Sequence, residues 1–516
     1  MLLALGGMII AAMTTDLNEA LSSILLPNIS GSLGIGSDQS SWFGTIYDTA
    51  EIIGMAISPW FAITFSFRRW CLGVICLTAL SSALMPLTSN ITMVFILHGL
   101  QGLSGGLTIP LLMATALRAL APPIRLIGLA CYALTASFFP NLSTAVAALW
   151  SGVGDSSLGW QFAFYQAVPL SMAAACLVWF GMIQDPVQLQ RFKNFNWRGL
   201  ILAVMGLGSF AIVLEQGERL DWFNSHLIAV LSLASIVCIP LFLINEWFCK
   251  TPFIKLQMLS RRNLAYSLVT LFGFLIVGQA ASTVPNMYLQ EVQGFLPAQS
   301  YVITFIIAAS QLILLPLMVY ILDMEPVDAR IIAFIGKLCL LIACIGSSFL
   351  TSVWQRDQFY LWQGFASIGE AMVVMPLLMK ATNVVKPEEG PFAAALINTP
   401  RAISSTVAVW LINLIHSWRG DLHSTRLTTQ IGQERFRLIQ AHGGLTGSWS
   451  PLQPNGMPRS PDSLALLDKA VNQQVSVLTI SDIYLVLAGI ACFLILLVFV
   501  LPTRSYPPRI ALLMKK

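Results

Sequence analysis

Fourteen apolar stretches, each long enough to cross a lipid bilayer as a helix, follow one another along the chain. A transmembrane helix needs about 20 predominantly apolar residues. Charged residues make up only 10% of the sequence and hydrophobic residues 56%, which is too little charge for the surface of a soluble domain. The sequence therefore predicts an all-α polytopic membrane protein, and it excludes a soluble enzyme or a nucleic-acid binder. The predicted spans are, to within a few residues, 2–29, 41–62, 70–88, 91–117, 125–150, 161–183, 198–216, 226–246, 264–289, 298–321, 331–351, 358–381, 391–415 and 479–502.

Basic residues are distributed unevenly between the two sets of loops. If the N-terminus lies in the cytoplasm, the inner loops and the tail hold most of the 28 Lys and Arg residues, Lys337 and Lys380 among them. The short outer loops then hold only Arg219 and Arg356. The positive-inside rule therefore predicts that both termini are cytoplasmic and that the long loop at 417–478 is periplasmic.

The order of the spans predicts two related halves. The polar segments 122–125 and 386–390 each follow the fourth span of a six-span unit, provided that spans 7 and 8 are an insertion. Such a 6+2+6 plan matches a common transporter architecture. The predicted parts are an N-terminal six-helix bundle at 1–183, two inserted helices with linkers at 184–263, a C-terminal six-helix bundle at 264–502 and a cytoplasmic tail at 503–516.

Acidic residues occur in pairs within the first two spans. Asp16 and Glu19, and then Asp48 and Glu51, share the spacing D-x-x-E, which places each pair on one helix face. Charges inside a membrane are costly and mark functional candidates. Crowded carboxyls hold protons more tightly, so these four could exchange protons or attract a cation; a water-exposed funnel wall is the alternative. The uncharged candidates for a substrate cavity are Asn18, Ser22, Gln101, Asn141 and Gln166.

Further ionisable residues lie in later spans. Glu370 and Arg401 fall near the midplane of spans 12 and 13, which predicts an intramembrane ion pair, either functional or purely structural. His98 in span 4 could change its charge near neutral pH and join the proton-coupling residues, or it could be a satisfied buried histidine. Glu215 and Asp482, near the outer ends of their spans, are interpreted as interfacial.

Sequence signatures of soluble catalysis are missing. The sequence has no P-loop, no GxSxG and no HExxH, and its five histidines lack the spacing of a zinc site. We therefore expect no catalytic residues, no bound metal and no cofactor.

Five short motifs follow one another along the chain. They read L-N-E-A-L-S-S-I-L-L-P at 17–27, L-Q-G-L-S-G-G at 100–106, W-R-G-L at 197–200, P-F-I-K-L at 252–256 and N-T-P-R at 398–401. Their order and spacing resemble the major facilitator superfamily, and more closely its fourteen-span drug:proton antiporters of the EmrB/QacA type. The resemblance covers nearly the whole chain and implies the major facilitator fold.

Four positions depart from the pattern of that group. Its first-span acid falls at Asn18, so its role would pass to Glu19 or Asp16. Its span-4 arginine falls at His98, and Ile63 replaces the acid of the loop after span 2. The span-5 antiporter motif retains Pro140 without its glycines. The D-x-x-E pairs are therefore expected to take over proton coupling.

The resemblance implies a proton-coupled efflux transporter of the bacterial inner membrane that exports lipophilic drugs or toxic compounds by alternating access. The proton gradient would supply the energy. A periplasmic adaptor and an outer-membrane channel would be partners, and the long loop would contact the adaptor or act as a passive linker. The altered span-5 motif keeps open a transporter of one metabolite, such as an organic acid or a siderophore. A transporter-like sensor or assembly factor is a third reading.

Overall fold

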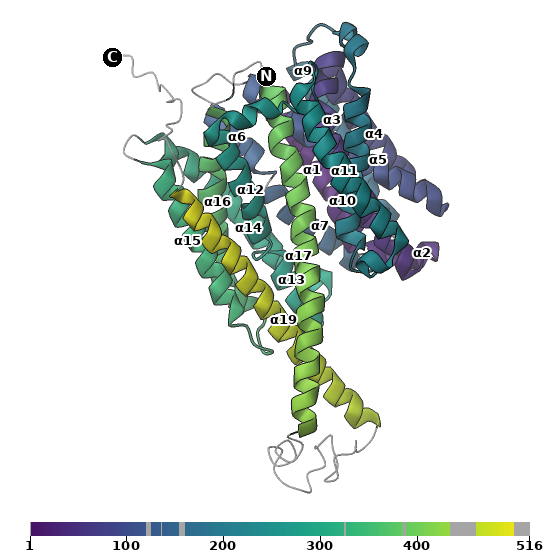
Figure 1. Ribbon diagram of the computed structural model, residues 1–516, viewed down its shortest axis with the longest axis vertical. Coiled ribbons are helices and arrows are strands. Elements are labelled where there is room, and N and C mark those ends of the chain that lie inside the picture. The colour runs from purple at the N-terminus through teal and green to yellow at the C-terminus, as the bar shows by residue number, and fades with distance from the viewer. Residues whose placement is uncertain are drawn as a thin grey trace.

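The computed structural model describes residues 2–119, 125–135, 137–153, 160–324, 327–383, 385, 389–433 and 461–499. The predicted tail at 503–516, most of the segment 122–125 and part of the segment 386–390 lie outside these ranges. Within them the secondary structure is helical and contains no strand. Figure 1 shows long helices gathered side by side into one bundle.

The helices before residue 182 pack mainly on one another. The central helix α1 contacts α5, α7 and α9, while α4 joins α5 to α9. The closest approach is between α3 and α5, where glycines allow two backbones to meet. The helices of this first group are α1 (Leu2–Ile24), α2 (Leu26–Leu33), α3 (Ser37–Phe65), α4 (Phe67–Leu84), α5 (Ile91–Ala119), α6 (Arg125–Ala133), α7 (Phe138–Val153), α8 (Gln161–Tyr165) and α9 (Ala167–Gly181).

Two helices, α10 (Trp197–Gln216) and α11 (His226–Phe248), pack on each other and precede a second group. In that group α15 contacts α16 and α19, and α12 contacts α16, α17 and α19. The two groups meet through α7 with α14 and through α3 with α17. The second group comprises α12 (Arg262–Gly278), α13 (Thr283–Glu291), α14 (Pro297–Asp323), α15 (Ala329–Ser348), α16 (Arg356–Asn383), α17 (Gly390–Gln433) and α19 (Pro461–Val498).

Eleven helices of the described chain are long and apolar enough to cross a membrane, and a twelfth is the pair α1 and α2, bent by 62°. The helices α3 and α17 are not among them, since polar residues interrupt their apolar sequence. These helices confirm the predicted all-α polytopic architecture.

The bundle has two distinct ends (Figure 1). We call the end near Leu2 the basic face, because Lys255 and Arg261 lie there, paired with Glu389 at 3.2 and 2.7 Å. From the opposite end, the hairpin face, the helices α17 and α19 extend beyond the bundle. The stretch 417–478, expected to be a loop, is therefore helical at both flanks, since α17 continues to Gln433 and α19 begins at Pro461.

Two lysines assigned to inner loops lie inside helices instead. Lys337 in α15 is 1% exposed and Lys380 in α16 is 2% exposed. The Lys337 ammonium donates to the Tyr266 hydroxyl at 3.1 Å and to the Leu494 carbonyl at 2.8 Å. Long lysine stems allow such burial when the ammonium finds acceptors. The assignment of both lysines to inner loops was therefore wrong, although the predicted spans 331–351 and 358–381 already contained them.

Candidate functional site

The four predicted carboxyls lie on α1 and α3, which both pack on α5. Glu19 interacts electrostatically with Asp16, Asp48 and Glu51, which makes them one charge cluster. Asp16 is 8% exposed, and its Oδ2 is enclosed without a hydrogen-bond partner in the described chain. Glu19, in contrast, is exposed, although α1 packs against α5, α7 and α9. We call these four residues the carboxyl cluster.

Tyr47 lies amid the carboxyl cluster and was missed by sequence reasoning. Its side chain is 2% exposed and its hydroxyl donates to the Thr15 carbonyl at 3.2 Å. All four carboxyls act electrostatically on this hydroxyl. Its place four residues before Glu51 was the signal that could have identified it, since residues i and i+4 on a helix share a face.

Arg401 on α17, in the second helical group, lies within electrostatic range of the carboxyl cluster. Its charge acts on Asp16, Glu19 and Glu51. Its guanidinium also donates to the Thr135 hydroxyl at 2.7 Å and to the Thr135 carbonyl. Arg401 thus links the first group to the second and supplies the positive charge that the carboxyls require.

The predicted ion pair between Glu370 and Arg401 is not formed. The Glu370 carboxylate accepts from the Gln311 amide at 3.3 Å, and that amide also donates to the Ser367 carbonyl. The two residues share a depth, but α16 packs on α12, α14 and α15, whereas α17 turns Arg401 toward the first group. Depth along a span does not fix the direction in which a side chain points.

His98 belongs to a polar network that joins α1, α4 and α5. Its Nδ1 lies 3.1 Å from Gln101 Oε1 and 3.5 Å from Ser22 Oγ, and its ring stacks on Phe43 at 3.9 Å. Ser82 accepts from Asn18 at 2.8 Å and from Gln101 at 3.3 Å. This geometry is that of a satisfied buried histidine, one of the two alternatives.

The remaining cavity candidates have local partners. Asn141 donates to the Ser137 carbonyl of its own segment at 2.6 Å. Gln166, between α8 and α9, accepts from the Trp150 indole at 3.2 Å. Neither has a described contact with the carboxyl cluster, so the five candidates do not form one site.

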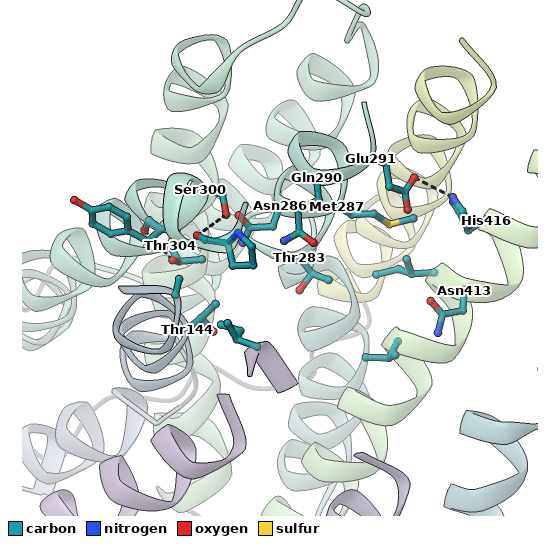
Figure 2. Close-up of a pocket in the computed structure, with 16 residues that line it drawn as sticks. Thr144, Thr283, Asn286, Met287, Gln290, Glu291, Ser300, Thr304, Asn413 and His416 are labelled. Atoms are coloured by element: carbon teal, nitrogen blue, oxygen red, sulfur yellow. Dashed lines mark hydrogen bonds and ion pairs between the residues drawn. The ribbon is translucent and has the colours of Figure 1, made fainter. Parts of the chain in front are cut away.

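A cavity of about 450 Å³ opens between the two groups near the hairpin face. Figure 2 shows Glu291 and His416 at one side of it, 3.2 Å apart. The hydrogen bond and negative charge of Glu291 raise the pKa of His416 above its usual value, against the opposing effect of burial. The lining mixes apolar and uncharged polar side chains: Ile24, Thr144, Ala148, Thr283, Asn286, Met287, Gln290, Pro297, Ser300, Tyr301, Thr304, Val409, Ile412 and Asn413.

On the side of Arg401 that faces away from the cavity, side chains of the two groups are in contact. The Tyr132 hydroxyl donates to Asn398 Oδ1 at 2.7 Å, and the Asn398 amide lies 3.7 Å from Met113 Sδ. These contacts hold the two groups together on the basic-face side of Arg401, while the cavity lies toward the hairpin face.

Known proteins resemble this chain over most of its length. Residues 8–409 match the Major Facilitator Superfamily. The fatty acid resistance protein FarB of Neisseria gonorrhoeae is 24% identical over 494 residues, which cover 93% of this chain and 92% of FarB. The multidrug export protein EmrB of Escherichia coli (strain K12) is 24% identical over 93% of this chain and 91% of EmrB.

Solved structures agree on the fold. The proton:xylose symporter XylE, bound to 6-bromo-6-deoxy-D-glucose, superposes with a TM-score of 0.57 at 12% identity, covering 100% of this chain and 99% of XylE. An all-helical bundle with this arrangement, together with the match over residues 8–409, identifies the chain as a member of the Major Facilitator Superfamily.

Proposed function

We propose that this protein is a proton-coupled efflux transporter of the bacterial inner membrane, which exports lipophilic drugs or other toxic compounds by alternating access. The observation that carries the proposal is the carboxyl cluster on α1 and α3, faced by Arg401 from the other helical group. The names of the relatives EmrB and FarB, a multidrug export protein and a fatty acid resistance protein, support the substrate class.

Proton binding would change the forces between the two groups. A deprotonated Glu19 attracts the guanidinium of Arg401, and a protonated one does not. In the conformation open toward the hairpin face, a proton from that side reaches Glu19 and weakens that attraction. The groups then rock, the basic face opens, and the proton leaves as substrate enters. Export of the substrate is thereby tied to inward movement of protons.

We further propose fourteen spans in a 6+2+6 arrangement with both termini in the cytoplasm. The eleven apolar helices, the bent pair of α1 and α2, and the helices α3 and α17 together account for them. The two polar helices contact each other and α5 inside the bundle, where the apolar helices shield them from lipid. Lys255 and Arg261 at the basic face support the proposal that it is the cytoplasmic side.

A periplasmic adaptor and an outer-membrane channel are proposed partners. The extensions of α17 and α19 would then lie in the periplasm, in reach of an adaptor. Asp482 joins α19 to α17 at one level, since its carboxylate is 2.6 Å from Arg419 Nε and 2.7 Å from His423 Nε2. Two helical extensions anchored to each other at this point offer a defined contact surface, which favours this proposal over a passive linker.

Proton movement in inside-out membrane vesicles tests the proposed function. A pH gradient is imposed, and lipophilic cations, organic acids and fatty acids are added to vesicles with the protein, its Glu19→Gln variant or neither. We expect some compounds to dissipate the gradient only with the unaltered protein. Glu218→Gln is the matched control, because Glu218 contacts Trp222 outside the carboxyl cluster. Full activity of Glu19→Gln would remove Glu19 from the mechanism, and no response to any compound would contradict the proposal.

A further inference from the structure

The inserted helix α10 lies on the seam between the two helical groups. It contacts α3 of the first group and α17 of the second, as well as its partner α11. Trp222, just beyond α10, meets Trp410 of α17 edge-on with ring centroids 6.4 Å apart. Because α10 contacts both groups, a movement of one group against the other changes its contacts.

Polar contacts fix α10 against α3 near the hairpin face. The Gln216 amide donates to the Thr45 hydroxyl at 2.6 Å and to the Ser41 carbonyl at 2.9 Å. Beyond them, Arg219 pairs with Asp38 at 3.2 Å. Gln216 and Thr45 are 2% and 1% exposed, so these bonds are sheltered from water and hold the register of the two helices.

The same interface brings two carboxyls into contact. Glu215, the residue before Gln216 on the face of α10 that packs on α3, lies within hydrogen-bonding reach of Asp48. Its Oε1 is enclosed and has no donor within the described chain. Two carboxylates cannot bond each other without a proton between them, and an enclosed oxygen without a donor is costly when charged. The arrangement is satisfied when one proton lies between Asp48 and Glu215.

Other charged groups surround this pair from each helix packed near it. Glu19 on α1 acts on both carboxyls, and Glu51 on α3 acts on the same cluster. From α17, Arg401 acts on Glu19 and Glu51. The pair therefore adjoins the carboxyl cluster, with Asp48 common to both.

We propose that Glu215 and Asp48 share one proton and that Glu215 is the outermost carboxyl of the proton pathway, so that the inserted helix takes part in coupling. This inference rests on the proposed function. A proton arriving from the hairpin face binds Glu215, moves to Asp48 along their hydrogen bond, and passes from there to Glu19. Each transfer leaves one carboxylate charged and one carboxylic acid neutral, so charge is conserved along the path. The interpretation of Glu215 as interfacial is replaced by a role inside the protein.

Difference infrared spectroscopy of the purified full chain in lipid tests the shared proton directly. The carboxylic C=O band is followed as the pH is changed, for the unaltered protein, Asp48→Asn, Glu215→Gln and the double variant. We expect each single variant to remove the same band and the double variant to remove nothing more, because the proton belongs to the pair. A full band in Glu215→Gln, or additive losses in the double variant, would overturn the proposal.

A control variant distinguishes the effect of packing α10 on α3 from the effect of the shared proton. Asp38→Asn breaks the ion pair with Arg219 at the same interface and leaves Asp48 and Glu215 intact. In proteoliposomes we expect Glu215→Gln to lower proton-coupled flux on the order of tenfold and to alter its pH profile. Glu215→Asp should restore part of that flux, and Asp38→Asn should keep the profile. An equal effect of Asp38→Asn would reduce Glu215 to a structural role.

The infrared result does not depend on transport. If the unaltered protein shows the shared band but moves no protons with any compound, the proposed function fails and the proton-sharing pair stands. If coupled flux is present and Glu215→Gln leaves both the band and the pH profile unchanged, this inference fails and the proposed function stands.

Discussion

Replacing Gly106 with alanine tests how closely α3 and α5 must approach for the carboxyl cluster to form. A Cβ atom there would lie 2.7 Å from the carbonyl carbon of Glu51 and 2.8 Å from its Cα. Carbon atoms in contact prefer about 3.5–4.0 Å, so the backbones must part by about 1 Å. Overpacking of this kind costs about 3 kcal/mol, and the better helix propensity of alanine returns about 1 kcal/mol. The net loss of stability is thus about 2 kcal/mol.

The assay is thermal unfolding of the purified chain in one detergent, followed by its tryptophan fluorescence. Gly73→Ala on α4 is the matched control, because a Cβ there meets nothing within 4 Å. Gly99→Ala is intermediate, since its Cβ meets only Ile46 Cγ2 at 3.0 Å, the end of a side chain that can move. We expect the midpoint to fall clearly for Gly106→Ala, slightly for Gly99→Ala and not at all for Gly73→Ala, and we expect Gly106→Ala to lose proton-coupled flux. Equal midpoints for Gly106→Ala and Gly73→Ala would refute the close-approach argument.

Three further predictions concern charged groups. Arg401→Ala removes the cation facing the carboxyl cluster and should lower proton-coupled flux in proteoliposomes by about tenfold or more; unchanged flux would separate Arg401 from coupling. Glu291 raises the pKa of His416, so their pair stabilises the protein fully below the ordinary histidine value of about 6.5 and is lost as pH rises through the raised pKa. Glu291→Gln should lower that pKa in histidine NMR titrations, and an unshifted curve would contradict the pairing. Glu389→Gln removes two ion pairs at the basic face, each worth about 0.2–1 kcal/mol. Because these pairs help to hold that face closed, we expect faster labelling of a cysteine placed at Asn398. Unaltered labelling would contradict this prediction.

Spacing along the chain was enough to predict the helices and the two acidic pairs. A long apolar stretch is the main sequence signal that a helix can cross a bilayer. The i, i+3 spacing fixed which acids share a face, and the structure brings Glu19 and Asp48 together from adjacent helices. The helices α3 and α17 are too polar to be recognised as spans by hydropathy. Their polar character follows from their position inside the bundle.

The partners of these residues could not be predicted, because a hydropathy pattern gives depth and not direction around a helix axis. Arg401 matches Glu370 in depth and yet faces Thr135 and the carboxyl cluster. Glu215 lies near a helix end, where an exposed carboxylate costs little, and only the packing of α10 on α3 turns it toward Asp48. Tertiary contacts decide both cases, and one sequence contains no direct record of them.

The length of α17 has a mechanical consequence. The helix has 44 residues, and the part from Arg401 to Gln433 is about 48 Å long at 1.5 Å per residue. A tilt of about 10° at Arg401 would carry the far end through about 8 Å. The helix therefore acts as a lever, whose fulcrum lies among the carboxyls and whose tip lies outside the bundle. A small displacement at the fulcrum is magnified at the tip, and a load at the tip resists the turn at the fulcrum with the same leverage.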